Sequence, residues 1–237
     1  MIKHYLQPFA PAARQQHLSL DDFEEASVPV AERRFDAADL IFAPGDPGGQ
    51  LYFLLEGTVR LYKTYGEYKE ATLALLQDGD VFGELSLDEA LCQNSFAEAV
   101  TDTRVAVVRK SVLTDAIRRH PEFGSKLLFS VAERLKQSDE VIESLLHREV
   151  SVRLATLLLN LGERFGEPEG SDTVLKMGLT HQDLANMIVS TREAVSKVMS
   201  EFQRAGLIEV RNRRIAISPR LAEIRLSDPY LSPGAAA

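Results

Sequence analysis

Residues 179–217, LTHQDLANMIVSTREAVSKVMSEFQRAGLIEVRNRRIAI, decide the fold of this 237-residue chain. Thr180 and Asp183 fit a capping box, in which the threonine hydroxyl accepts from the third helical N–H and the carboxylate reaches back. Ser190-Thr191-Arg192-Glu193 predicts a second capping box ten residues later, so we expect two helices joined by a tight turn. Four apolar residues recur with helical spacing in the second helix and predict one buried stripe: Val195, Val198, Met199 and Phe202.

The opposite face of the second helix carries polar residues that suit DNA: Arg192, Glu193, Ser196, Lys197, Ser200 and Gln203. Arginine donates two hydrogen bonds to the major-groove edge of guanine, glutamate accepts from cytosine, and lysine binds guanine or phosphate. Arg192 and Glu193 occupy the first turn of this helix, where a recognition helix contacts bases. The alternative at this point is a helical hairpin with a solvated charged face.

A basic hairpin is expected directly after the two helices. The β-prone runs 207–210 and 215–217 flank Arg211-Asn212-Arg213-Arg214, whose three arginines suit phosphate contacts. Residues 180–220 hold 7 Lys and Arg against 4 Asp and Glu, whereas residues 1–149 hold 16 against 25. Positive charge therefore collects on the helix-turn-helix and hairpin, as DNA binding requires, although the whole chain has a net charge of −8.

The composition, 45% hydrophobic and 26% charged, is that of an ordinary globular protein with one large or two modest domains. No apolar run reaches membrane-spanning length, and residues 1–5 lack the apolar region of a secretory signal. We therefore expect a cytoplasmic protein with no membrane partner. Cys92 is the only cysteine, which excludes an internal disulfide and an all-cysteine iron–sulfur cluster. No histidine lies between residues 18 and 119, and no nucleophile–base pair is evident, so we expect neither a metal site nor an enzyme.

Residues 40–108 predict many short strands separated by turns. The β-prone runs are 40–42, 51–55, 58–62, 71–76 and 105–108. Turn sequences such as Pro44-Gly45-Asp46, Glu56-Gly57 and Asp78-Gly79-Asp80 interrupt them. This spacing favours a compact barrel or roll over a parallel α/β sheet.

From residue 110 the pattern becomes helical. We expect a short helix over 111–120, stopped by Pro121, a long helix over about 122–149 and a third over 152–164, followed by a loop over 166–171. Residues three and four apart in the long helix form a coiled-coil seam and predict a parallel dimer contact: Leu128, Val131, Leu135, Ser138, Ile142 and Leu145. The alternative is a helix packed on its own domain, and both arrangements are compatible.

Several motifs occur in a characteristic order: FAPGD (42–46), YFLLEG (52–57), GDVFGELSL (79–87), RLA (153–155), LTHQDLA (179–185) and STREAVSK (190–197). Through them, residues 35–220 resemble the CRP/FNR superfamily of bacterial transcription regulators. The resemblance implies a cyclic-nucleotide-binding-type β-roll, a long dimerisation helix and a winged helix. It also implies a homodimer that binds palindromic double-stranded DNA and contacts RNA polymerase. The family usually has glycine in the turn where Val189 stands, and a β-branched residue tolerates positive φ poorly.

The family's effector pocket is only partly matched. Gly83-Glu84-Leu85-Ser86 corresponds to the pocket segment, but cAMP-binding relatives have an Arg-Ser pair where Asn94-Ser95 stands. Relatives that use 2-oxoglutarate also rely on an arginine in this neighbourhood. Neither Asn94 nor Ser95 supplies the charged, two-pronged contact that an anion favours. The family's adenine-contacting Thr-Ser pair corresponds to Ser138-Asp139, although a polar seam residue such as Ser138 also serves to fix register.

The expected architecture is α+β, with an N-terminal β-roll (1–109), a helical linker with the dimerisation helix (110–149), and a winged helix-turn-helix (150–237). The resemblance implies that Arg192, Glu193 and Lys197 read a half-site resembling TGTGA. We expect phosphate contacts from Thr180, Gln182, Thr191, Arg211, Arg213 and Arg214. We expect a regulator that requires no cofactor. The alternatives are a regulator gated by cAMP or another small effector, and a ligand-binding signalling module that docks protein instead of DNA.

Overall fold

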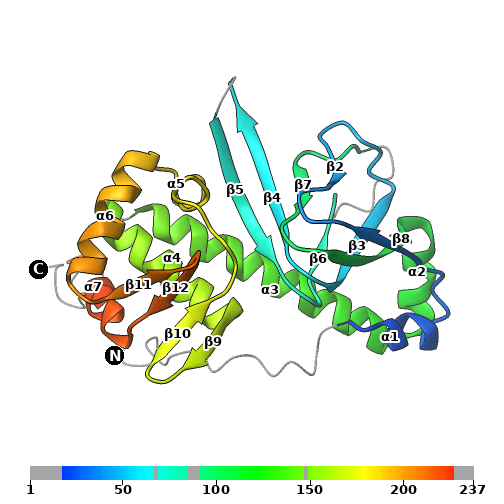
Figure 1. Ribbon diagram of the computed structural model, residues 1–237. Helices are drawn as coiled ribbons and strands as arrows, with labels where there is room; N and C mark the ends of the chain where they lie inside the picture. Colours follow the sequence, from blue (N-terminus) through cyan, green and yellow to red (C-terminus); the bar gives the residue numbers. More distant parts are fainter. Residues whose placement is uncertain (1–17, 67–68, 85–90, 147–148, 227–237) are drawn as a thin grey trace, which may run out of the picture. The chain divides into compact units, whose positions relative to one another are not determined.

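The computed structural model describes residues 18–66, 69–84, 91–146 and 149–226. The chain divides into two compact units, residues 1–61 with 74–136, and residues 62–73 with 137–237. Both helices and antiparallel sheets contribute to the described chain, which confirms the expected α+β class (Figure 1).

Two four-stranded sheets form the expected β-roll, which belongs to the first unit except for residues 62–73 of β4, β5 and their connection. Their orders are β1-β8-β3-β6 and β2-β7-β4-β5 (Figure 1). The strands are β1 (Ala31–Phe35), β2 (Leu40–Phe42), β3 (Gln50–Glu56), β4 (Val59–Tyr65), β5 (Lys69–Leu76), β6 (Val81–Phe82), β7 (Phe96–Ala99) and β8 (Thr103–Arg109). The central strand β3 pairs antiparallel with both β6 and β8.

Both faces of β3 are buried, because alternate side chains of a strand point to opposite sides of its sheet. Leu51 and Phe53 enter one apolar cluster, which also contains residues of the neighbouring helices. Tyr52 and Leu54 enter a second cluster, which contains Phe42 and residues of both sheets. The roll therefore has one core between its sheets and another beneath its helices.

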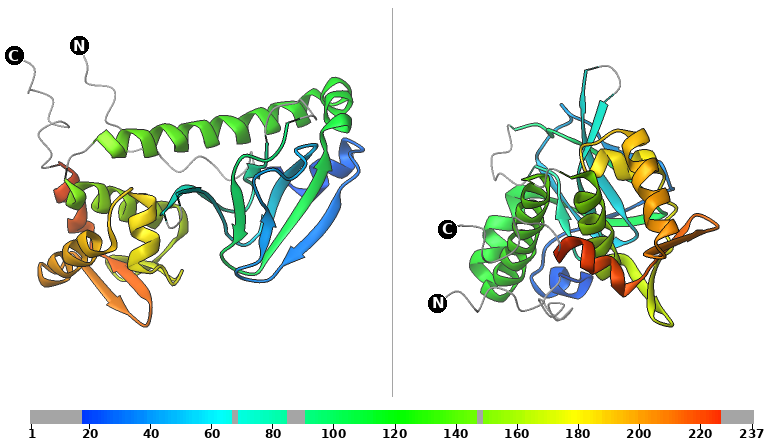
Figure 2. Two further views of the ribbon diagram at one scale, coloured as in Figure 1. Left: turned by 90° about the horizontal axis from the view of Figure 1, so that it is seen from above. Right: turned by 90° about the vertical axis from the view of Figure 1, so that its left-hand side faces the viewer.

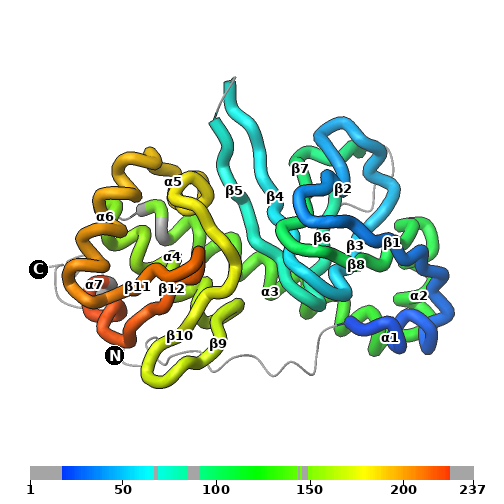
Figure 3. Tube along the Cα trace, viewed as in Figure 1, coloured from blue at the N-terminus to red at the C-terminus, as the bar shows by residue number. Residues whose placement is uncertain are grey.

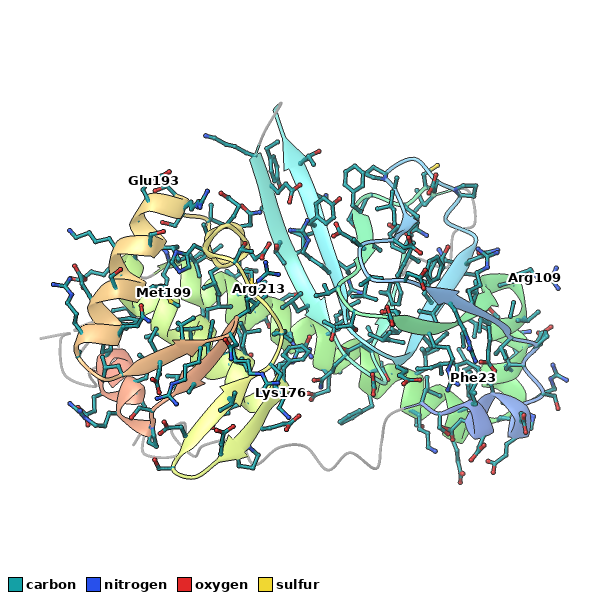
Figure 4. All side chains as sticks on the ribbon, in the orientation of Figure 1. Phe23, Arg109, Lys176, Glu193, Met199 and Arg213 are labelled. Carbon is teal, nitrogen blue, oxygen red and sulfur yellow. The ribbon has the colours of Figure 1, made fainter. Side chains whose placement is uncertain are left out.

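Three helices cover the outer face of this roll: α1 (Leu20–Glu25), α2 (Lys110–Arg119) and the beginning of α3 (Pro121–Leu146), the long unbroken helix of Figure 2. The sequence pattern did not predict α1. Its Phe23, labelled in Figure 4, is fully buried and packs edge-on against Phe53 and Phe123, with ring centroids 4.7 and 5.4 Å apart. Apolar packing therefore holds this six-residue helix on the roll.

Polar contacts of Asp22 also stabilise α1 and connect it to α3. The Asp22 carboxylate accepts from the Ser19 backbone N–H at 2.8 Å and from the Ser19 hydroxyl at 2.9 Å, and it forms an ion pair with Lys126 of α3. Burial acts to raise the pKa of the Asp22 carboxyl, but the contacts with Lys126 and Ser19 together hold it below its ordinary value.

From residue 150 onward the second unit contains the remaining elements, in the order helix, hairpin, two helices, hairpin and short C-terminal helices. They are α4 (Val150–Phe165), β9 (Gly166–Glu169), β10 (Asp172–Leu175), α5 (His181–Met187), α6 (Arg192–Arg204), β11 (Ile208–Arg211), β12 (Arg214–Ile217), η2 (Pro219–Leu221) and α7 (Ala222–Leu226). The sheet order is β11-β12-β10-β9. This winged helix-turn-helix confirms the expected arrangement.

Two predicted boundaries were wrong. The predicted loop over 166–171 is largely strand β9, which pairs with β10 from Gly166↔Leu175 to Glu169↔Asp172. Pro168 did not prevent this, because β9 is an edge strand and one side of its backbone needs no N–H donor. The long helix ends at Leu146, and Glu149 is the N-cap of α4 rather than the last turn of α3.

Candidate nucleic-acid interface

Helix α5 begins with the predicted capping box. Thr180 Oγ1 accepts from the Asp183 backbone N–H at 3.1 Å, and Asp183 Oδ2 accepts from the Thr180 N–H at 2.8 Å. Leu184 and Ala185, on the inner side of α5, are fully buried. Gln182 is exposed and donates to Asn186 Oδ1 at 2.8 Å, so its amide nitrogen already has a partner within the helix.

The turn between α5 and α6 carries backbone strain at Val189. This residue has φ +50° and is 62% exposed, and the Ser190 N–H donates to the Ala185 carbonyl at 3.0 Å (turn traced in Figure 3). The bond closes the helix C-terminus around a left-handed residue, a position at which glycine is usual. Val189 therefore adopts a left-handed backbone conformation, which β-branched residues tolerate poorly.

Helix α6 presents the expected two faces. Val195, Val198, Met199 and Phe202 are buried, whereas Arg192, Glu193, Lys197 and Ser200 are exposed. In Figure 4, Glu193 lies at the N-terminal end of α6 with its side chain outward, and Met199 lies on the side of α6 that packs on α4. The polar side chains thus form one continuous surface along the helix.

The predicted second capping box was wrong. Thr191, not Ser190, is the N-cap, and its hydroxyl accepts from the Ala194 N–H at 3.2 Å. Ser190 precedes the N-cap, and its backbone N–H completes the C-terminal bond of α5. The third helical residue is consequently Ala194, which has no side-chain acceptor to reach back.

The wing is a two-residue hairpin, tighter than the four-residue turn expected. Arg211 pairs with Arg214, and both central residues, Asn212 and Arg213, have positive φ, at +50° and +62°. This backbone is typical of a type I′ turn, in which asparagine is well tolerated and arginine is not. Arg211 donates to Glu209 Oε1 at 2.5 Å, whereas Arg213, in the turn of the hairpin, is exposed.

The seam residues of α3 divide into two groups. Leu128, Leu135 and Ile142, spaced by seven residues, are 69%, 63% and 60% exposed, and Leu145 also is exposed. Val131 instead packs against the helix-side core of the roll. Ser138 and Asp139 are exposed on the same helix.

The matched pocket segment surrounds Gly83. This glycine has φ +102°, and a Cβ atom there would lie 3.2 Å from Tyr52 Cδ2 and 3.6 Å from Gln93 Nε2. Asn94 is exposed and Ser95 is buried. Glu84 is half-buried, whereas Leu85 and Ser86 lie outside the described residues.

Two polar residues near this segment were not anticipated. Gln93 is 3% exposed, and its Nε2 has no hydrogen-bond partner among the described residues. Arg134 Nη1 donates to the Val81 carbonyl at 2.8 Å, two residues before Gly83, and burial lowers the pKa of its guanidinium while Asp80 opposes that shift. Sequence reasoning considered arginines only at positions 94 and 95, so it overlooked a cation supplied by α3.

Other kinds of site find no support in the described part of the chain. Histidine, cysteine and carboxylate side chains do not gather there in groups of three or more that could bind a metal. Among the described helices, none has the length and apolar character needed to cross a membrane.

Comparison with known proteins agrees with this geometry. Residues 32–120 match the family model of the cyclic nucleotide-binding domain, and residues 152–222 match that of the Crp-like helix-turn-helix domain. The chain belongs to the CRP/FNR family of transcription regulators. A regulator of this family binds DNA through its helix-turn-helix and has a dimeric architecture.

Curated relatives span most of this CRP/FNR regulator. It is 34% identical over 195 residues to a global nitrogen regulator of Synechocystis sp., covering 81% of this chain and 86% of that protein. It is 30% identical over 184 residues to a CRP-like cAMP-activated global transcriptional regulator of Mycobacterium tuberculosis, covering 78% and 82%. A solved CRP/FNR-family regulator from Thermus thermophilus superimposes with a TM-score of 0.69 at 33% identity, covering 83% of this chain and 99% of that one.

Proposed function

We propose that this regulator binds a palindromic DNA site with TGTGA-like half-sites as a homodimer, contacts RNA polymerase in the cytoplasm, and does not require cAMP. The observation that carries the proposal is the exposed polar face of α6, opposite a fully apolar buried stripe. Arg192 and Glu193 occupy the first turn of that face, where side chains of a recognition helix reach base edges. No catalytic role is part of the proposal.

Each DNA contact follows from side-chain chemistry. Arg192 donates to guanine, Glu193 accepts from cytosine N4, and Lys197, one turn further along α6, donates to guanine or phosphate. Phosphates are held by the exposed residues Thr180, Gln182, Thr191, Arg211, Arg213 and Arg214. These contacts fix the position of the domain, while the α6 side chains supply sequence preference.

The homodimer forms along α3. Leu128, Leu135 and Ile142 recur every seven residues and leave large apolar side chains in water, and a second copy of the same stripe would cover them. In this division of labour residues 1–109 form the effector-type domain, residues 110–149 pair the chains, and residues 150–237 bind DNA. Two recognition helices then reach half-sites about 34 Å apart, one turn of B-DNA.

Selection from a random double-stranded DNA pool tests the proposal directly. We expect enrichment of a two-fold symmetric sequence with TGTGA-like arms, bound with an affinity that falls steeply with salt because Lys and Arg displace counterions from phosphates. A protein that enriches no sequence and shows no salt dependence would contradict DNA recognition by α6.

A second candidate is a regulator of the same family gated by a small effector. The observation that favours it is a pair of polar groups near the pocket segment: the buried Gln93 amide, whose Nε2 has no hydrogen-bond partner among the described residues, and the Arg134 guanidinium, which binds the Val81 carbonyl. Titration calorimetry with cAMP separates the two candidates. Micromolar or tighter binding would establish gating by cAMP, whereas no heat with cAMP agrees with the principal proposal.

A further inference from the structure

One hydrogen bond joins the two helices of the helix-turn-helix on its polar side. His181, the first residue of α5, places Nδ1 2.7 Å from the Ser196 hydroxyl of α6. Both residues are half-buried. The ring has no other hydrogen-bond partner among the described residues, so Nε2, on the opposite side of the imidazole, is left for a partner from outside.

Ser196 behaves differently from three other serines in the described helices. Ser125, Ser130 and Ser200 each donate to the carbonyl oxygen four residues earlier, at 3.0, 3.2 and 2.9 Å. That bond is the default for a serine within a helix. The Ser196 hydroxyl instead contacts the His181 ring, so its direction is set by the neighbouring helix.

The pair lies beside the proposed DNA contacts. Ser196 follows Arg192 by one turn and precedes Ser200 by one turn, so it borders the exposed polar face of α6. The segment before α5 lies against the wing, because a Cβ atom on Gly178 would be 3.7 Å from both Cβ and Cδ of Arg213. His181 is therefore adjacent to the recognition helix and three residues from the segment that contacts the basic wing.

The chemistry of the imidazole determines what such a pair can do. A neutral histidine carries one N–H, and the partner of one ring nitrogen decides which nitrogen holds the proton. When the Ser196 hydroxyl donates to Nδ1, the proton must reside on Nε2. A phosphate oxygen only accepts hydrogen bonds, so this tautomer binds DNA backbone and the other does not.

The geometry points to Ser196 as a positioning residue that acts through His181. Ser196 O–H donates to Nδ1, and the Nε2–H thereby fixed donates to a phosphate oxygen of the DNA backbone. Ser196 itself does not read a base. This inference rests on the DNA binding proposed above and assigns to His181 a backbone contact that the sequence analysis did not include.

The tautomer of His181 tests the first half of the inference without DNA. In full-length protein labelled with ¹⁵N-histidine, long-range ¹H–¹⁵N spectra at pH 8, where histidine is ordinarily neutral, distinguish the two tautomers. The chain has only five histidines, and His181→Asn identifies the signal by its loss. We expect the Nε2–H form in the wild type and in Ser196→Thr, and a mixture of tautomers in Ser196→Ala.

Binding measurements test the second half. On the selected duplex, Ser196→Ala should weaken binding about threefold to tenfold, as loss of one well-oriented hydrogen bond does, while the matched control Ser125→Ala, at an exposed helical serine of α3, should change it less than twofold. The loss should be equal on a scrambled duplex, because phosphates carry no sequence information. In a His181→Ala background, Ser196→Ala should cause no further loss, since its effect passes through the ring.

Several outcomes would overturn the inference. They are an Nδ1–H tautomer in the wild type, equal affinities of Ser196→Ala and Ser125→Ala, or a Ser196→Ala loss that persists without His181. The last would mean that Ser196 touches DNA directly. If no variant binds any duplex, the proposed function fails, whereas the tautomer spectra still decide the Ser196–His181 arrangement.

Discussion

Replacing Val189 by glycine should stabilise the DNA-binding unit, although it removes a side chain. Val189 lies in the turn between α5 and α6 at φ +50°. A residue with a Cβ atom is strained there, because the Cβ lies too close to the following carbonyl oxygen in the left-handed region, and β-branching adds to the crowding. The surrounding hydrogen bond from Ser190 to Ala185 holds the backbone in that conformation whatever the side chain.

The expected gain is the difference between three contributions. A non-glycine residue held in a sparsely populated region costs about 2 kcal/mol, which glycine avoids. Glycine loses about 0.8 kcal/mol through the greater freedom of the unfolded chain. The valine side chain is 62% exposed, so its removal forfeits about 0.6 kcal/mol of apolar burial. The net stabilisation is about 0.6 kcal/mol.

Amide hydrogen exchange of peptides from α5 and α6 measures this gain in the full-length protein. Because about 1.4 kcal/mol is tenfold in an equilibrium constant, Val189→Gly should slow exchange through local opening about threefold. Val189→Ala is the matched control, since it loses the same apolar contacts but keeps a Cβ atom. The alanine variant should exchange no more slowly than the wild type. Faster exchange in the glycine variant than in the alanine variant would refute the argument from strain.

Four further outcomes are expected. Arg192→Ala should cost about 1–3 kcal/mol of DNA affinity and relax preference at one guanine; equal losses on selected and scrambled duplexes would contradict base reading. Arg213→Gly should weaken binding to all duplexes alike and lower the slope of log affinity against log salt by about one; an unchanged slope would exclude a phosphate contact. The same variant should slow amide exchange in the wing, because the φ of +62° at this position suits glycine. Leu135→Asp should yield monomers in sedimentation, whereas the matched change Leu73→Asp should leave the dimer intact. The depressed pKa of Asp22 stabilises the first unit above about pH 4, and this stability should be lost as the pH falls through the folded-state pKa; an Asp22→Asn variant with the same acid transition would contradict it.

The helix-turn-helix was predictable because its signals are local. The Thr180–Asp183 capping box and the apolar stripe of α6 depend on residues three and four apart, and both are as expected. The resemblance to the family marked Val189 as unusual in its turn but did not decide its conformation, and the structure gives it φ +50°. The β-prone run 51–55 was likewise predicted as a strand, because it is a short apolar run bounded by turn sequences.

Features that depend on distant partners were not predictable. Helix α1 is stable only because Phe23 reaches Phe53 and Phe123, and six residues are too few to show a helical period. Arg134 reaches the Val81 carbonyl across 53 residues, and His181 reaches Ser196 across a turn whose geometry the sequence did not specify. No local pattern marks such pairs.

The exposed stripe of Leu128, Leu135 and Ile142 makes promoter occupancy depend on the concentration of the regulator. If chains must associate before a symmetric site can be held, the bound fraction grows with the square of chain number while single chains predominate. Doubling synthesis then raises promoter occupancy about fourfold at the low end. Mass action alone thus gives the regulator a threshold concentration for promoter binding. The dissociation constant of the dimer, to which these three apolar side chains of each chain contribute, sets that threshold.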